Sequence, residues 1–221
     1  MFNNNMFEIH IISLFPESIK PYLDTSIMQR AQSKGLFRYY IHNLADFSVR
    51  NTRRVDDRPY GGWAWTLITI EPLVNCIRDI FNTFWEMPII LTSPKWKRLN
   101  QKLSHKLSEK SKKYIIICWH YEGVDARIFD LFSIQELSIW DYVLSSGEIA
   151  SLVIIDSIVR LIPWVISEES LRDESFSENL QWKKEYPQYS RPEIFEWLQV
   201  PKILLSGDLK KIQEWKNKNL S

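Results

Sequence analysis

Short runs of apolar and β-branched residues alternate with longer helical patterns in this chain, and this alternation constrains its fold more than any other feature. The strand-like runs are residues 7–15, 39–44, 88–91, 114–118 and 139–144. Helical periodicity covers residues 17–33, 71–85, 99–110, 125–132 and 147–162. Strands and helices in this order predict an α/β fold with a mostly parallel sheet that helices cover on both faces.

The pattern changes after residue 162. Residues 163–191 are rich in charge, serine and proline, which is typical of a linker. Two short amphipathic helices are expected near residues 192–198 and 208–217. The predicted organisation is a main domain at 1–165, a linker at 166–190 and a small helical tail at 191–221.

Charge and cysteine content narrow the classes of protein. The net charge is +1, so any contact with RNA depends on local basic patches. Cys76 and Cys118 are too few for a disulfide framework and share no metal-ligand spacing with the histidines. We expect both to be reduced and buried in a cytoplasmic protein. The first 15 residues contain Glu8 and His10 and lack a basic n-region, which indicates neither a signal peptide nor a membrane span.

Ligands of parallel sheets bind beyond the carboxyl ends of the strands. The segments that follow strand-like runs here are SPKW after Leu91, CWHYEG at 118–123 and SIWDYVLSSGE at 138–148. The chain contains neither a P-loop nor a GxGxxG motif. The position of these segments supports the hypothesis of a nucleotide-like ligand there. No phosphate-binding motif in the sequence adds support to it.

Eight motifs occur in one order: ISLFPE, RRVDDRPYGG, YEGVDARI, DYVLSSGE, IDSIVRLIP, DESFSE, YSRPE and LLSGDLKKIQEWK. Together they resemble the bacterial tRNA (guanine-N1)-methyltransferases of the trefoil-knot (SPOUT) methyltransferase superfamily, over about residues 7–218. The resemblance implies a deep C-terminal knot, S-adenosylmethionine as methyl donor, dependence on Mg²⁺, and a homodimer with shared active sites. The implied substrate is tRNA, methylated at N1 of the guanosine 3′ of the anticodon.

Tryptophan stands where this family has glycine. The chain has 6 Gly and 10 Trp, whereas glycine usually makes up about 7% of residues. Seven tryptophans fall on family glycines: Trp63, Trp65, Trp96, Trp119, Trp140, Trp164 and Trp197. Trp215 matches a family tryptophan, whereas Trp85 and Trp182 match nothing. UGA is read as glycine in some bacteria and as tryptophan in others. We therefore hypothesise that these seven tryptophans are encoded by UGA codons that the source organism reads as glycine. The alternative is a divergent protein whose pocket is filled with aromatic rings.

Methylation at N1 of guanine needs a base to remove the N1 proton and a cation near O6, where negative charge develops. The resemblance assigns the cation to Arg160, for which an ion pair with Asp156, four residues earlier, is the alternative. The family base is an aspartate, and Glu174 stands at that position with Asp173 before it. Because glutamate is longer by one methylene, the sequence leaves open which carboxylate is the base.

The resemblance places the donor in three loops. The implied donor-binding residues are Leu91, Thr92, Ser93, Pro94, Trp119, Glu122, Ile139, Trp140, Asp141, Tyr142, Val143, Leu144, Ser146 and Gly147. Ser146 replaces a usual glycine. Glu122 orients the donor or helps to hold Mg²⁺, and no other metal ligands are indicated.

Contacts with tRNA are expected from two regions of the chain. The first contains Asp56, Asp57 and Arg58 beside a cluster of three arginines, Arg50, Arg53 and Arg54. The second is Ser206, in a tail motif of the family. Residues 95–113 add a basic stretch that is equally typical of a solvated helix face. The glutamate at position 174 and the short tail suggest one alternative, a tRNA-binding protein without catalysis. A second alternative is a structural or small-ligand module that retains only the fold.

Overall fold

The structure is a computed structural model that describes residues 6–62, 65–95 and 97–221. The predictions on Trp63 and Trp96 therefore lie outside the described residues. The chain divides into two compact units, one ending at Ile166 and the other spanning Ser167–Ser221.

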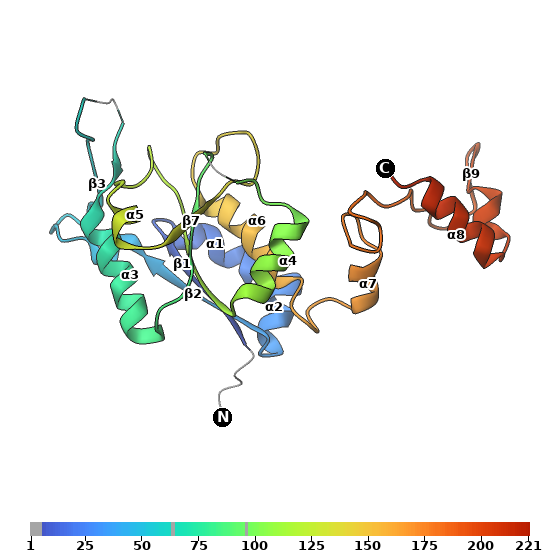
Figure 1. The fold of residues 1–221 in the computed structure, drawn as a ribbon, viewed down its shortest axis with the longest axis horizontal. Helices are drawn as coiled ribbons and strands as arrows, with labels where there is room; N and C mark the ends of the chain where they lie inside the picture. The colour runs from blue at the N-terminus through green and yellow to red at the C-terminus, as the bar shows by residue number, and fades with distance from the viewer. Residues whose placement is uncertain (1–5, 63–64, 96) are drawn as a thin grey trace. The chain divides into compact units, whose positions relative to one another are not determined.

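A five-stranded parallel sheet forms the centre of the first unit (Figure 1), with the order β2-β1-β6-β5-β7. Its strands are β1 (Phe7–Ser13), β2 (Phe37–Asn43), β5 (Ile89–Thr92), β6 (Lys113–Ile117) and β7 (Ile134–Leu137). The predicted α/β class with a parallel sheet is confirmed.

One predicted strand was wrong. Residues 139–144 form a loop, and the edge strand β7 ends before them at Leu137. β7 has the sequence IQEL, in which a glutamine and a glutamate interrupt the apolar run, because an edge strand is only half-buried. The apolar residues that follow are instead held at the end of the sheet, where they reach a pocket.

Helices cover both faces of the sheet. One face carries α1 (Pro16–Leu23), α2 (Ser26–Ser33), α4 (Gln101–Lys110) and α6 (Glu148–Val159). The other face carries α3 (Ile70–Phe84) and α5 (Ile128–Leu131). The single helix expected over residues 17–33 is two helices, because Asp24 caps the end of α1 and Thr25 is extended.

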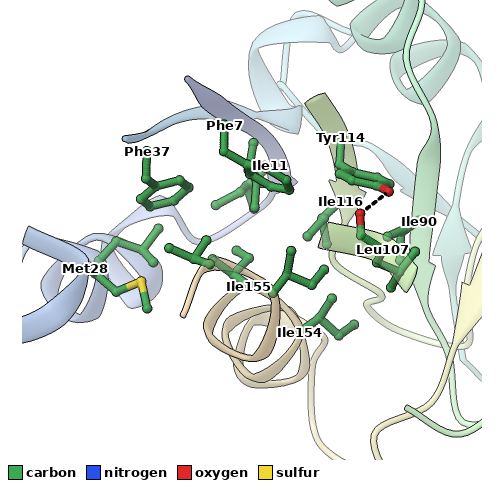
Figure 2. Close-up of a cluster of buried hydrophobic side chains, with 14 of the residues drawn as sticks. Phe7, Ile11, Met28, Phe37, Ile90, Leu107, Tyr114, Ile116, Ile154 and Ile155 are labelled. Atoms are coloured by element: carbon green, nitrogen blue, oxygen red, sulfur yellow. Dashed lines mark hydrogen bonds between the residues drawn. The ribbon is translucent and has the colours of Figure 1, made fainter. Parts of the chain in front are cut away.

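Alternate residues of each strand enter alternate core layers. Phe7 and Ile11 of β1 pack against α2 and α6, together with Ile116 of β6 (Figure 2). Ile12 points to the opposite layer, which α3 covers. Within the first layer the Tyr114 hydroxyl donates to the Leu107 carbonyl oxygen at 2.7 Å, so the one polar atom of that ring is satisfied.

Cys76 and Cys118 are buried and unpaired, as expected. Burial raises the pKa of both thiols, and the charge of Glu148 adds to the shift at Cys118. Neither thiol is therefore a reactive thiolate at neutral pH.

Short elements complete the first unit. After β2 the chain forms the 3₁₀ turn η1 (Leu44–Phe47) and then a two-stranded antiparallel ribbon. The ribbon pairs β3 (Asp56–Asp57) with β4 (Leu67–Ile68).

The second unit contains α7 (Glu168–Arg172), β8 (Ile194–Phe195), β9 (Leu198–Gln199), η2 (Lys202–Leu205) and α8 (Leu209–Lys218). The helix predicted at residues 192–198 was wrong, because β8 and β9 form an antiparallel hairpin there. Glu196 lies between the two strands at φ 55°, a left-handed conformation that a helix excludes. The helix predicted at residues 208–217 is confirmed by α8, whose first turn is capped by Asp208.

None of the helices described is long and apolar enough to cross a membrane.

Candidate functional site

A small pocket lies where β5, β6 and β7 end, and it has a volume of about 40 Å³. Three loops enclose it: the residues after Thr92, the residues around Trp119, and the long loop between β7 and α6. The lining residues are Thr92, Ser93, Pro94, Trp119, Leu137, Ser138, Ile139, Trp140, Tyr142, Val143, Leu144, Ser146, Gly147 and Ala150. Position in the fold thus identifies the carboxyl edge of the sheet as the candidate site, as the parallel topology predicts.

Backbone hydrogen bonds fasten the three loops to one another. The Trp119 N–H donates to Thr92 Oγ1 at 2.8 Å, and this hydroxyl donates to the Ile117 carbonyl oxygen at 3.2 Å. The Gly147 N–H donates to the Trp119 carbonyl oxygen at 2.6 Å. The end of β5, the end of β6 and the start of α6 therefore form one frame, held by backbone groups and by the buried Thr92 hydroxyl.

Gly147 makes this close approach possible. A Cβ at this position would lie 2.3 Å from both Thr92 Oγ1 and Trp119 N, and 2.9 Å from the Cys118 carbonyl carbon. Two of these three atoms belong to backbone. A side chain at position 147 is therefore incompatible with the frame as it stands.

The loop between β7 and α6 is held by contacts at its beginning. The Ser138 hydroxyl donates to the Trp140 carbonyl oxygen at 2.9 Å. The Arg98 guanidinium pairs with Asp141 at 2.9 Å and lies over the Trp140 ring, 5.3 Å from its centre. Since Arg98 and Asp141 are both largely exposed, this pair adds little stability and mainly orients the indole.

A buried polar group lies behind the frame. Glu148 begins α6 and is 2% exposed, and its Oε1 accepts from the Ser13 hydroxyl at 2.7 Å. The Ser151 hydroxyl donates to the Glu148 carbonyl oxygen at 2.7 Å. A carboxylate at a helix N-terminus also interacts favourably with the helix dipole. Glu148 therefore ties β1 to α6 and positions the helix that carries Arg160.

Most of the predicted donor-binding residues line this one pocket, and three do not. Leu91 points into the core layer under α3, Glu122 is exposed with its N–H donating to the Thr66 carbonyl oxygen, and Asp141 pairs with Arg98. Sequence reasoning missed Leu137, Ser138 and Ala150. The signal for the first two was the end of strand β7, which the apolar run at residues 139–144 concealed.

The predicted catalytic residues fall in both compact units. Arg160 caps the C-terminus of α6 and is half-buried, and Asp156 accepts a 2.6 Å hydrogen bond from the Tyr22 hydroxyl. In the second unit, Asp173 caps α7 and is exposed, while Glu174 is half-buried and its carbonyl oxygen accepts from Ser177 N–H.

The predicted RNA-binding residues near β3 form a surface of arginine–aspartate pairs. Arg54 binds Asp56 at 3.0 Å, and Arg50 binds Asp57 at 2.6 Å. These guanidinium groups lower the pKa of Asp57, and the hydrogen bond from Arg54 lowers that of Asp56 against the opposing effect of burial. Arg58 is exposed and makes no ion pair with any described residue.

The other predicted RNA contact lies in the second unit. Ser206 follows η2, and its hydroxyl donates to the Ile203 carbonyl oxygen at 2.7 Å. The same hydroxyl oxygen accepts from the N–H of Asp208 at 3.2 Å, and Asp208 is the residue directly before α8. Ser206 therefore shapes the turn into α8 and leaves the hydroxyl engaged with backbone.

No group of three or more His, Cys, Asp or Glu residues that could hold a metal ion occurs in ranges 6–62, 65–95 and 97–221. Mg²⁺ keeps several waters and often takes only one or two protein carboxylates, so such a cluster is not required for it.

A covered parallel sheet with a loop-built pocket at its carboxyl edge defines an α/β ligand-binding domain. The sequence profile of the family described as tRNA (Guanine-1)-methyltransferase TrmD matches residues 7–221. The chain belongs to this family, whose members are methyltransferases; the family implies S-adenosylmethionine as the donor.

Relatives and a solved structure support the same assignment. The chain is 46% identical to the tRNA (guanine-N(1)-)-methyltransferase of Clostridioides difficile (strain 630), over 94% of this chain and 89% of that protein. It is 43% identical to the enzyme of the same name from Carboxydothermus hydrogenoformans, over 96% of this chain and 81% of that protein. The crystal structure of tRNA (m1G37) methyltransferase from Aquifex aeolicus superposes with a TM-score of 0.80 at 32% identity, covering 97% and 89% of the two chains.

The residues that line the pocket do not fit the family's donor as they stand. Sites for ligands of this size usually enclose roughly 300–1,000 Å³, whereas this pocket encloses about 40 Å³. The backbone frame lies at the carboxyl edge of the sheet, where parallel sheets bind ligands, but the indoles of Trp119 and Trp140 belong to the lining of its pocket. The disagreement is therefore between two side chains and the ligand, and not between the fold and the ligand.

Proposed function

We propose that this protein methylates tRNA at N1 of the guanosine 3′ of the anticodon, with S-adenosylmethionine as donor. The observation that carries the proposal is the family match over residues 7–221, and the pocket supports it because most of the residues expected to bind the donor line it. S-adenosylmethionine supplies an electrophilic methyl group on a sulfonium.

The roles of the chain's own residues follow from the chemistry of guanine. N1 carries a proton at neutral pH, so a carboxylate must accept it as the new bond forms. Asp173 or Glu174 supplies this carboxylate. Negative charge then develops on O6, and the guanidinium of Arg160 stabilises it. The half-buried position of Arg160 at the end of α6 favours this role, because partial burial strengthens its interaction with a developing charge.

We further propose that the enzyme is a homodimer whose active sites combine residues of both chains. Apolar side chains on α6 and just before α1 support an interface there. Phe15 is 40% exposed, Ile149 61% and Val153 43%, and α1 and α6 pack against each other. A cluster of exposed apolar groups on adjacent elements is typical of an interaction surface.

The trefoil knot belongs to this proposal as well. The chain leaves edge strand β7, returns through residues 138–146 to Trp119, and continues into α6 against α1 and β1. This return path supports threading of α6 through the preceding loops, with residues 1–165 forming the knotted domain and 191–221 the tRNA-binding tail. Glu122, an exposed residue whose N–H donates to the Thr66 carbonyl oxygen, would orient the donor or help to hold Mg²⁺.

The proposed activity is tested with a glycine-restored chain, in which Trp63, Trp65, Trp96, Trp119, Trp140, Trp164 and Trp197 are changed to glycine. We expect it to methylate tRNA with a guanosine 3′ of the anticodon, and the product to be mapped to N1 by mass spectrometry. Arg160→Ala in this chain should abolish methyl transfer and leave donor affinity in calorimetry nearly unchanged, because O6 charge exists only in the transition state.

Two results separate the alternatives. A chain that binds tRNA and donor but transfers no methyl group is a catalytically impaired tRNA-binding homologue, for which Glu174 at the base position is the motivating observation. Methylation of a different RNA position would assign the protein to another activity of the same superfamily. Either result overturns the proposed function.

A further inference from the structure

The backbone around several tryptophans has the conformation of glycine. Nine non-glycine residues with positive φ occur among the described residues, and three of them are Trp85, Trp164 and Trp182. Tryptophan supplies only 10 of 221 residues, so this share is far above its abundance. A bulky residue with positive φ is a rare and strained case in which glycine is the usual occupant.

Trp85 is the clearest of the three. It ends α3 with φ 75° and ψ 167°, a region that only glycine populates to a significant extent. Its N–H donates to the Phe81 carbonyl oxygen at 2.8 Å, as the residue after a helix does. The side chain is 78% exposed, so no packing of the indole offsets the backbone strain.

Trp164 and Trp182 also have positive φ, one in each compact unit, and Trp182 is half-buried. Trp164 follows α6 at φ 73° and is 75% exposed. Trp182 has φ 64° in a tight turn, where its N–H donates to the Ser177 carbonyl oxygen at 2.9 Å. Trp85 and Trp182 are the two tryptophans that the family resemblance alone does not explain.

Trp215 provides an internal contrast. It lies inside helix α8, with its ring 6.3 Å from the rings of Tyr186 and of Tyr189. Its backbone is helical and its side chain has aromatic partners, which is how a genuine tryptophan is accommodated.

We infer that positions 85, 164 and 182 are glycine in the functional protein, together with positions 119 and 140, whose glycines open the donor pocket. The codon written as tryptophan at these positions is UGA, which the source translates as glycine, whereas Trp215 comes from UGG. With positions 63, 65, 96 and 197, this leaves Trp215 as the one tryptophan of the native chain. The part about positions 119 and 140 rests on the proposed function, and the part about positions 85, 164 and 182 rests on backbone conformation alone.

The gene sequence gives the first test. We expect UGA at all nine positions and UGG at position 215, with glycine found at positions 85, 164 and 182 by mass spectrometry of the native protein. UGG at any of these three positions, or tryptophan in the native protein there, overturns the inference and leaves a divergent protein with an aromatic-filled pocket.

Stability gives a second test that does not involve the donor. Changing Trp85, Trp164 and Trp182 to glycine should raise Tm by at least about 5 °C, because three strained residues are relieved. Trp215→Gly is the matched control and should lower Tm, since it removes ring contacts from a helix interior. An unchanged or lower Tm for the triple variant contradicts the inference.

Donor affinity gives the third test and separates the inference from the proposed function. Trp119→Gly with Trp140→Gly should raise affinity for S-adenosylmethionine in calorimetry by at least about a hundredfold, since the lining indoles leave too little volume. Equal donor affinity overturns the pocket part of the inference. The last comparison uses a chain in which all nine of these tryptophans, every one except Trp215, are changed to glycine. If the codons are UGA and Tm rises as expected, but this chain binds donor and methylates no tRNA, the glycine assignment stands and the proposed function fails.

Discussion

Gly147 stands with its backbone against Trp119 at the junction of β6 and α6, and it permits a test at the scale of a single residue. Gly147→Ala places a Cβ within 2.3 Å of a backbone nitrogen. We expect a loss of about 1–3 kcal/mol in the free energy of unfolding, measured with urea, because overpacking forces the frame to open. Ser145→Ala, at an exposed position in the same loop, is the control and should change stability by less than about 0.5 kcal/mol. Equal effects of the two changes would contradict the close packing described.

His10 gives the protein a pH-dependent stability. The ring is fully buried, and its Nδ1 lies 3.0 Å from Nε2 of His42. Burial lowers the pKa of His10 to about 3, with smaller contributions from His42 and Lys113, and burial lowers the pKa of His42 as well.

The sign of the effect follows from proton uptake. Unfolded histidine has a pKa of about 6.5, so below that pH the unfolded state binds a proton that the folded state does not. The stability from neutral His10 is complete above about pH 6.5 and is lost as pH falls toward 3, by about 1.4 kcal/mol per pH unit. His10→Phe should remove about this slope between about pH 6 and pH 5 in urea unfolding. A slope that stays the same in the variant shows that His10 is protonated in the folded state.

At the scale of elements, the end of α7 gives the two candidate carboxylates different degrees of exposure. The helix ends at Arg172, and the turn after it places exposed Asp173 and half-buried Glu174 in succession. In the glycine-restored chain, Glu174→Gln should lower kcat by about 10²–10⁴-fold, the usual contribution of a general base. Donor affinity should not change. Asp173→Asn should be milder, and the opposite ranking would assign the base to Asp173.

The boundaries of elements show how far pattern reasoning extends. Periodicity located β1, β2, β5 and β6, because buried parallel strands are continuously apolar. It misplaced the fifth strand, since half-buried β7 reads IQEL while the pocket loop after it contains Ile139, Val143 and Leu144. A loop that lines a pocket and a strand that enters a core both require apolar residues, so hydrophobicity alone does not distinguish them.

At the scale of the whole molecule, the proposed shared active site predicts complementation. Glycine-restored chains with Arg160→Ala and chains with Glu174→Gln should each be inactive alone. After mixing and subunit exchange, some dimers contain one site with both groups intact, so we expect methyl transfer to return to about a quarter of the unmodified rate, for random exchange with one intact site in each mixed dimer. Sedimentation should show a dimer at micromolar concentration. A monomer, or a mixture that remains inactive, would contradict shared sites.

The sequence by itself determined the fold class and the family of this protein. Alternating periodicity required a covered parallel sheet, and motifs spread over the chain identified the loops at its carboxyl edge. It also predicted that tryptophan stands at seven positions where the family has glycine. These conclusions need only local patterns and their order along the chain.

Only the tertiary structure decided which of those residues meet. Thr92, Trp119 and Gly147 come from three separate segments. The Thr92 hydroxyl and the backbones of Trp119 and Gly147 are joined by hydrogen bonds because parallel strands end at a common edge. Likewise, no sequence pattern distinguishes Trp85 or Trp182 from an ordinary tryptophan, whereas their positive φ does, since only a residue without a Cβ adopts positive φ at no steric cost. The residue types of a segment determine its preference for helix, strand or loop. The packed chain fixes the distances and dihedral angles on which chemistry depends.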